Sequence, residues 1–161
     1  MFMKKIHFVI AAGAICCIAF KTFAQWAKPG SDPDKLIVGE WRNIYLKLII
    51  HHKNDAPQTM EADSSNWEAR LHIKPIRTHF QRNGSYYSEY FNLKDSLVRR
   101  TTGIWTTKGD SIIMTEQTPE KSVLRLHLKI ENNVASFNGL IDFDGEGISN
   151  DEYYGMQRKF N

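Results

Sequence analysis

The sequence has little cysteine, no excess charge outside its first residues, and no extended helical periodicity. Only Cys16 and Cys17 occur among 161 residues, and both lie in the segment 1–24. That segment also holds three of the 21 basic residues and no acidic one, so 18 basic side chains face 18 acidic ones in the remainder. These shortages exclude a disulfide scaffold, cysteine chemistry and electrostatically driven nucleic-acid binding.

The segment 1–24 has the features of an export signal. Lys4 and Lys5 precede an apolar run over 6–20, which is shorter than the ~20 residues that a membrane-spanning helix needs. Small residues before Gln25 predict cleavage after Ala24. We therefore expect a periplasmic or extracellular protein with no nucleic-acid partner.

A lipid anchor is the alternative form of this leader, because Cys16 or Cys17 could accept lipid. The residues before them are Ile15 and Cys16, whereas lipidated cysteines usually follow Gly, Ala or Ser. Membrane association is expected only if such lipidation occurs. The next residues, 25–35, contain two prolines and one glycine and predict an N-terminal lead-in to a single domain over 36–161.

The clearest structural pattern is a hairpin near the C-terminus. Over Lys121–Glu131, leucines and an isoleucine alternate with charged residues, the period of a half-buried strand. Asn132-Asn133 supplies turn residues, and 135–143 returns with apolar residues at every second position. Similar turns at Asn83-Gly84 and Gly109-Asp110 predict further hairpins.

Continuing this pattern along the chain predicts eight strands and no helix. Eight antiparallel strands joined mostly by tight turns favour an all-β, up-and-down β-barrel, and a two-sheet β-sandwich is the alternative. The polar segment 51–66 is predicted to be a long loop, either a lid or a surface excursion. The predicted strands cover 36–50, 70–82, 85–92, 99–107, 111–117, 121–131, 135–143 and 152–160.

Three residues give the chain a resemblance to the lipocalin-like (calycin) barrels. Gly39-Glu40-Trp41 opens the first strand and Arg158 lies in the last. The resemblance implies that Gly39 and Trp41 close one barrel end, with Arg158 packed over the indole. True lipocalins usually add a helix after the eighth strand and often carry a disulfide. The absence of this helix and of this disulfide favours a small exported bacterial lipocalin-like domain.

The stretch from Gly39 to Asn43 is also similar to the opening strand of avidin-type barrels. The biotin site of that family needs a serine soon after the asparagine, and Ile44-Tyr45-Leu46-Lys47 stands here instead. We do not expect biotin binding.

Patterns that could carry metal or catalytic chemistry are incomplete. The segment Asp142–Gly147 has the acidic spacing of a calcium loop, but its twelfth position is Tyr153 rather than glutamate. The adjacent His51 and His52 would point to opposite sides of a strand. A barrel could bring Glu89 and His72 together as an acid–base pair, yet no catalytic motif is present. We predict no metal, no cofactor and no enzyme activity.

The aromatic residues suggest a ligand site inside the barrel. If a cavity exists, inward-facing Trp105, Leu126 and Phe137 would form its wall, with Tyr87 and Phe91 nearer the rim. The sequence thus favours an exported lipocalin-like protein that binds a small, largely apolar molecule. The alternative is a cell-envelope protein-interaction module with a packed barrel and no ligand. A cavity of ~300 Å³ or more would favour the first.

Overall fold

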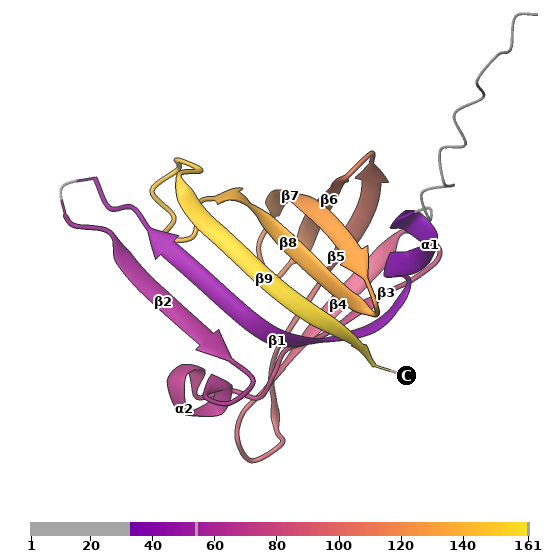
Figure 1. Cartoon of the computed structure of the whole chain (residues 1–161), viewed down its shortest axis with the longest axis horizontal. Helices are drawn as coiled ribbons and strands as arrows, with labels where there is room; N and C mark the ends of the chain where they lie inside the picture. The colour runs from indigo at the N-terminus through magenta and orange to yellow at the C-terminus, as the bar shows by residue number, and fades with distance from the viewer. Residues whose placement is uncertain (1–32, 54, 161) are drawn as a thin grey trace, which may run out of the picture. The chain divides into compact units, whose positions relative to one another are not determined.

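The computed structural model describes residues 33–53 and 55–160 (Figure 1). The predicted leader 1–24, with Cys16 and Cys17, and most of the predicted lead-in 25–35 lie outside the described residues. The described part contains two short helices and nine strands: α1 (Pro33–Ile37), β1 (Gly39–Ile50), β2 (Gln58–Asp63), α2 (Trp67–Leu71), β3 (Arg77–Phe80), β4 (Ser85–Phe91), β5 (Leu97–Lys108), β6 (Ser111–Thr118), β7 (Ser122–Glu131), β8 (Val134–Ile141) and β9 (Asp151–Phe160).

Eight of these strands form a closed antiparallel barrel. Strands β3 to β9 pair in chain order, and β1 pairs with both β9 and β3, which closes the ring. Closure pairs both edges of each strand, which an open sheet cannot do for its outer strands. The predicted eight-stranded up-and-down barrel is confirmed, and it is compatible with a lipocalin-like fold.

The ninth strand, β2, pairs only with β1 among the described residues. One edge of β1 pairs with β9 over most of its length, whereas two different strands pair with the other edge. Gly39–Arg42 pair with β3, and Tyr45–Ile50 pair with β2. Strand β2 therefore lies alongside the second half of β1, beyond the point where β3 ends (Figure 1).

The prediction of a long loop over 51–66 is wrong, because this segment contains β2. Only Met60 and Ala62 face inward in a stretch that is otherwise polar, so the alternation is too short to indicate a strand.

The predicted strand over 70–82 is also shorter in the structure. Pro75 lacks the backbone N–H that a ladder needs, and β3 begins two residues after it.

Both helices are single turns, which explains why no helical period is visible in the sequence. Helix α1 begins with Pro33 and has Asp34 in its first turn, two favourable choices at a helix N-terminus. Helix α2 ends at His72, whose left-handed backbone terminates it. Neither described helix has the length and apolar character that a membrane crossing requires.

The buried apolar side chains form two clusters along the barrel. The larger one fills the end near α1, and it includes Trp41, Trp105 and Phe137. The smaller one lies where β2 and α2 pack on β1, around Leu48 and Trp67. The predicted hairpin β7–β8 turns at Asn132 and Asn133, both with the positive φ that this type of turn requires.

Candidate ligand cavity

One end of the barrel is closed by Trp41. Its ring is fully buried, and its Nε1 donates a hydrogen bond to the carbonyl oxygen of Ile37 at 2.6 Å. The ammonium of Lys159 lies 5.2 Å from the ring centroid and donates to the Leu36 carbonyl at 2.9 Å. A side chain at Gly39 would place its Cβ 2.8 Å from Lys159 Cε, so glycine leaves room for this lysine.

The cation over Trp41 is Lys159, and not Arg158 as the family resemblance implies. Inward-facing residues alternate along β9, and Gln157 is buried inside the barrel. Arg158 therefore points outward and is exposed, whereas Lys159 points inward again. Burial lowers the pKa of the Lys159 ammonium below its ordinary value. The implied position of Arg158 over the indole is therefore not the one in the structure.

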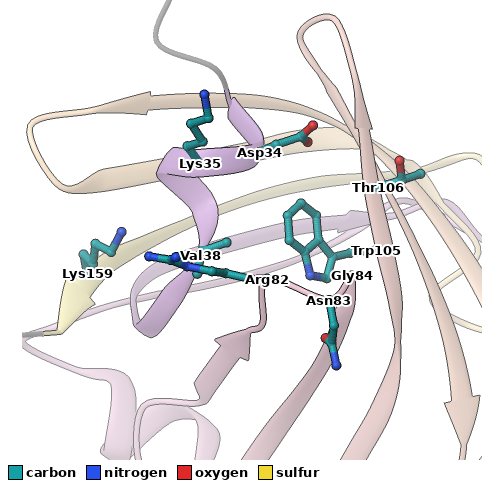
Figure 2. Close-up of a pocket in the computed structure, with 9 residues that line it drawn as sticks. All are labelled: Asp34, Lys35, Val38, Arg82, Asn83, Gly84, Trp105, Thr106 and Lys159. Atoms are coloured by element: carbon teal, nitrogen blue, oxygen red, sulfur yellow. The ribbon is translucent and has the colours of Figure 1, made fainter.

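The outer surface beside this closed end has a groove of about 850 Å³ (Figure 2). Trp105 borders it, and its ring points toward α1 (Figure 2). The Trp105 Nε1 donates to the carbonyl oxygens of Gln81 and Ser85 at 3.2 and 3.0 Å, which fixes the indole between the two strands of a hairpin. The other lining residues are Asp34, Lys35, Val38, Arg82, Asn83, Gly84, Thr106 and Lys159.

A second cavity, of about 480 Å³, lies inside the barrel, and every barrel strand contributes to its lining. It extends to the β6–β7 turn and to the start of the β8–β9 loop, at the end opposite Trp41. Part of its lining is apolar and part is polar, and apolar side chains also come from β1 and from β3 and the residue before it (Leu46, Leu48, Phe80 and Ile76). The apolar wall comes from β6, β7 and β8 and consists of Met114, Leu124, Leu126, Phe137 and Ile141.

The polar wall comes from the adjoining strands β9, β1, β3, β4 and β5. It consists of five uncharged side chains, each at most 9% exposed: Asn43, Thr78, Ser88, Thr101 and Gln157. Asn43 lies directly opposite Gln157 in the sheet, and Ser88 lies opposite both Thr78 and Thr101. Directly opposed residues point to the same side of a sheet, so these side chains form two groups on the inner face, Asn43 with Gln157 and Ser88 with its two threonines. The groups are diagonal neighbours, because Asn43 N donates to the carbonyl oxygen of Ile76, two residues before Thr78.

Hydrogen bonds within the polar wall leave one buried acceptor unused. Gln157 Nε2 donates to Asn43 Oδ1 at 3.2 Å, and the hydroxyls of Thr78 and Ser88 are 2.9 Å apart. The remaining amide oxygen, Gln157 Oε1, is buried and has no hydrogen-bond partner in the described part of the chain. A buried polar atom without a partner is unfavourable, so this oxygen attracts a donor.

Charged residues, phenols and further apolar side chains line the rest of the cavity. Arg99 and Glu116 lie 3.6 Å apart, with the guanidinium 5.5 Å from the Tyr90 ring. Burial raises the pKa of Tyr90 and of Tyr86, and the nearby Glu116 carboxylate raises both further. Burial also raises the pKa of Tyr153 to about 12. All three phenols are therefore neutral at physiological pH and can donate hydrogen bonds.

The structure brings together only two of the five predicted ligand-binding residues. Leu126 and Phe137 line the inner cavity, whereas Trp105 lies at the closed end. Tyr87 and Phe91 point to the outer face, since Tyr86, Ser88 and Tyr90 line the cavity and alternate with them. Ligand contacts of Leu126 and Phe137 stay predictions.

Sequence reasoning missed the polar wall, because it searched the inward positions for apolar side chains only. The signal was nevertheless present. Thr78 and Ser88 stand two residues from the buried aromatics Phe80 and Tyr86, and strand alternation places such pairs on one face.

The structure does not form the acid–base pair considered from the sequence. His72 terminates α2 and is exposed. Glu89 pairs with Arg100 across the outer face of the barrel. The two side chains lie on different parts of the surface and share no site.

Carboxylates gather in the β8–β9 loop, where Asp142, Asp144 and Asp151 have oxygens within 4.8 Å of one another. Backbone amides of this region already occupy them: Asp151 accepts from His51 N at 2.8 Å and from Phe143 N at 2.7 Å. Burial of Asp151 opposes ionisation, but these amides outweigh it and hold its pKa below the ordinary value. These hydrogen bonds hold the loop against the start of β9.

The two adjacent histidines contact different carboxylates at this end. His51 Nε2 lies 3.2 Å from Glu152, and His52 Nδ1 lies 3.2 Å from Asp144. Both residues follow the end of β1 and are not in a strand, so the prediction from strand alternation does not apply to them.

Comparison with known proteins identifies no relative of this chain. No family model matches it, and no curated protein is significantly similar to it. The likeness to calycin barrels consequently rests on topology and on the residues of the closed end. Function has to be argued from the cavity.

Proposed function

We propose that this protein is an exported lipocalin-like binding protein that holds a small, largely apolar ligand in its barrel cavity. The observation that supports this most is the inner cavity of about 480 Å³. Its volume falls in the range of ~300–1,000 Å³ that small-molecule sites occupy. A ligand there would contact the apolar wall over most of its surface.

The shape of the barrel supports ligand entry at one end only. Trp41 and Lys159 fill the end near α1, while the cavity reaches the β6–β7 turn and the β8–β9 loop at the other. The protein-interaction alternative assumed a packed barrel, and the inner cavity favours the ligand-binding proposal over it.

Native mass spectrometry of the protein purified from its own host tests the proposal. We expect a retained mass of a small molecule, released on denaturation. A cavity-filling variant shows whether the mass comes from the barrel. Leu124→Trp would fill the cavity from the apolar wall and should abolish retention. The matched control is Val123→Trp, the same change one residue earlier on the outer face, where the side chain is 55% exposed.

Retention of the small molecule by both variants would reject the proposed function, and so would its absence from both the native protein and the control.

Export is a separate part of the proposal and rests on the leader 1–24. Fractionation of host cells should find the protein outside the cytoplasm, without its first 24 residues. Replacement of both Cys16 and Cys17 by serine should leave it in the soluble fraction, since a lipid anchor would require one of them.

A further inference from the structure

The inner cavity is divided in a way that a site for a wholly apolar molecule does not need. Three adjacent strands supply its apolar wall, and the five strands beside them supply the polar wall together with further apolar residues, namely Leu46, Leu48, Ile76 and Phe80. All five side chains of the polar wall are nearly fully buried. Polar groups in such places are usually paired with protein or ligand groups.

The polar wall offers both kinds of hydrogen-bonding group. Among the described residues Gln157 Oε1 is an acceptor without a partner, and the amide nitrogen of the same side chain donates to Asn43 Oδ1. The hydroxyl of Thr101, and those of Thr78 and Ser88 next to it, can donate or accept. A fitting group therefore donates to Gln157 and accepts from a hydroxyl.

The polar wall carries no charge, and this limits the ligand further. A carboxylate or ammonium placed against it would be buried without a counter-ion, which is strongly unfavourable. The charged residues of the lining lie toward the open end of the cavity, and they are Arg99, Glu116, Glu120, Lys121 and Asp142. Arg99 is next to Thr101 on the inner face of β5, but it pairs with Glu116. A neutral group fits the polar wall, and an ionised one does not.

We infer that the cavity selects neutral amphipathic molecules whose head group both donates and accepts hydrogen bonds, a primary carboxamide being the simplest example. The head group lies against the polar wall and donates to Gln157 Oε1, while the apolar remainder lies along the apolar wall. This inference rests on the proposed function and adds the chemistry of the ligand to it.

Three probes with the same chain and different head groups test the inference: octanamide, N,N-dimethyloctanamide and octanoate, titrated by calorimetry at neutral pH. N,N-dimethyloctanamide lacks the amide N–H donors, and octanoate carries a negative charge. Each should bind roughly tenfold more weakly than octanamide, because one buried hydrogen bond is worth about that factor. Equal or tighter binding of either of the other probes would overturn the inference.

Two variants connect this preference to Gln157. Gln157→Met keeps the length of the side chain but removes the acceptor, and should reduce the advantage of octanamide to less than about threefold. The same change at the exposed Gln117 is the control and should leave the preference intact. If Gln157→Met does not fold, Ser88→Ala removes a hydroxyl from the same wall and should weaken octanamide selectively. An unchanged preference in the folded variant contradicts the inference.

Pyrene, which has no hydrogen-bonding group, separates this inference from the proposed function. If pyrene binds, and Leu124→Trp but not Val123→Trp prevents it, the cavity accepts ligands. Absence of any amide preference would then reject the head-group inference alone. If neither pyrene nor octanamide binds, both fail.

Discussion

The ammonium of Lys159 lies 5.2 Å from the centre of the Trp41 ring and donates a hydrogen bond to the Leu36 carbonyl. It thus joins the last strand to the indole that closes the barrel and to the helix that precedes the first strand. The neighbouring Arg158 has neither contact and is exposed to solvent.

Replacing Lys159 should therefore destabilise the barrel more than replacing Arg158. Lys159→Met removes a cation–π contact and a hydrogen bond, which together correspond to about 1–2 kcal/mol. Arg158→Met changes an exposed side chain, and its effect should stay within about 0.5 kcal/mol. Urea unfolding of the two variants measures the difference. Equal losses, or a greater loss in Arg158→Met, would assign the closing contact to the arginine.

This pair shows what a short motif can and cannot predict. The resemblance to calycin barrels implied that Gly39 and Trp41 lie at one barrel end. The cation depended on which residues of β9 face inward, and a shift of one residue moves every side chain to the other face. That register is set by pairing of β9 with β1, which includes an irregularity between Asn43 and Tyr45.

The buried carboxylate of Asp151 should give the protein a measurable acid sensitivity. Asp151 accepts hydrogen bonds from the backbone of His51 and Phe143, and its pKa is lowered by them. A lowered folded-state pKa means that the ionised form stabilises the fold above the unfolded-state value of 3.8. This stabilisation is lost as the pH falls through the lower, folded-state pKa.

Asp151→Asn should accordingly cost about 1–2 kcal/mol at pH 7, because charge-assisted hydrogen bonds are lost. The difference from the native protein should shrink as the pH falls below 3.8, where the native carboxyl also becomes neutral. Urea unfolding at pH 7 and at acidic pH measures both. Asp110→Asn, at an exposed turn, is the control. A difference that is the same at both pH values would contradict this role of the carboxylate.

The barrel was predictable because hairpin turns and alternation are local signals, whereas the cavity was not. Strand β2 shows too few apolar residues to be recognised, and its place is fixed by pairing with the second half of β1. The polar wall depends on closure, which brings Gln157 of the last strand beside Asn43 of the first. Such a contact between distant parts of the chain leaves no mark in the spacing of residues.

The two most buried tryptophans should respond differently to the same substitution. Trp41 Nε1 donates to the Ile37 carbonyl at 2.6 Å, at the last turn of α1, where carbonyls lack helical partners. Trp67 is 2% exposed, and its Nε1 is buried without a hydrogen-bond partner in the described residues. A phenylalanine leaves the Ile37 carbonyl unpaired in the first case and removes an unpaired donor in the second.

We expect Trp41→Phe to cost about 3 kcal/mol and Trp67→Phe about 1 kcal/mol, since both lose similar buried volume and only the first loses a hydrogen bond. The comparison is matched in residue type and burial, so the difference reports the indole N–H of Trp41 together with the contact of its ring with Lys159. The free energy of unfolding in urea, followed by circular dichroism, measures it. Equal costs would mean that volume alone determines both, and a larger cost at Trp67 would mean that its N–H has a partner in solution.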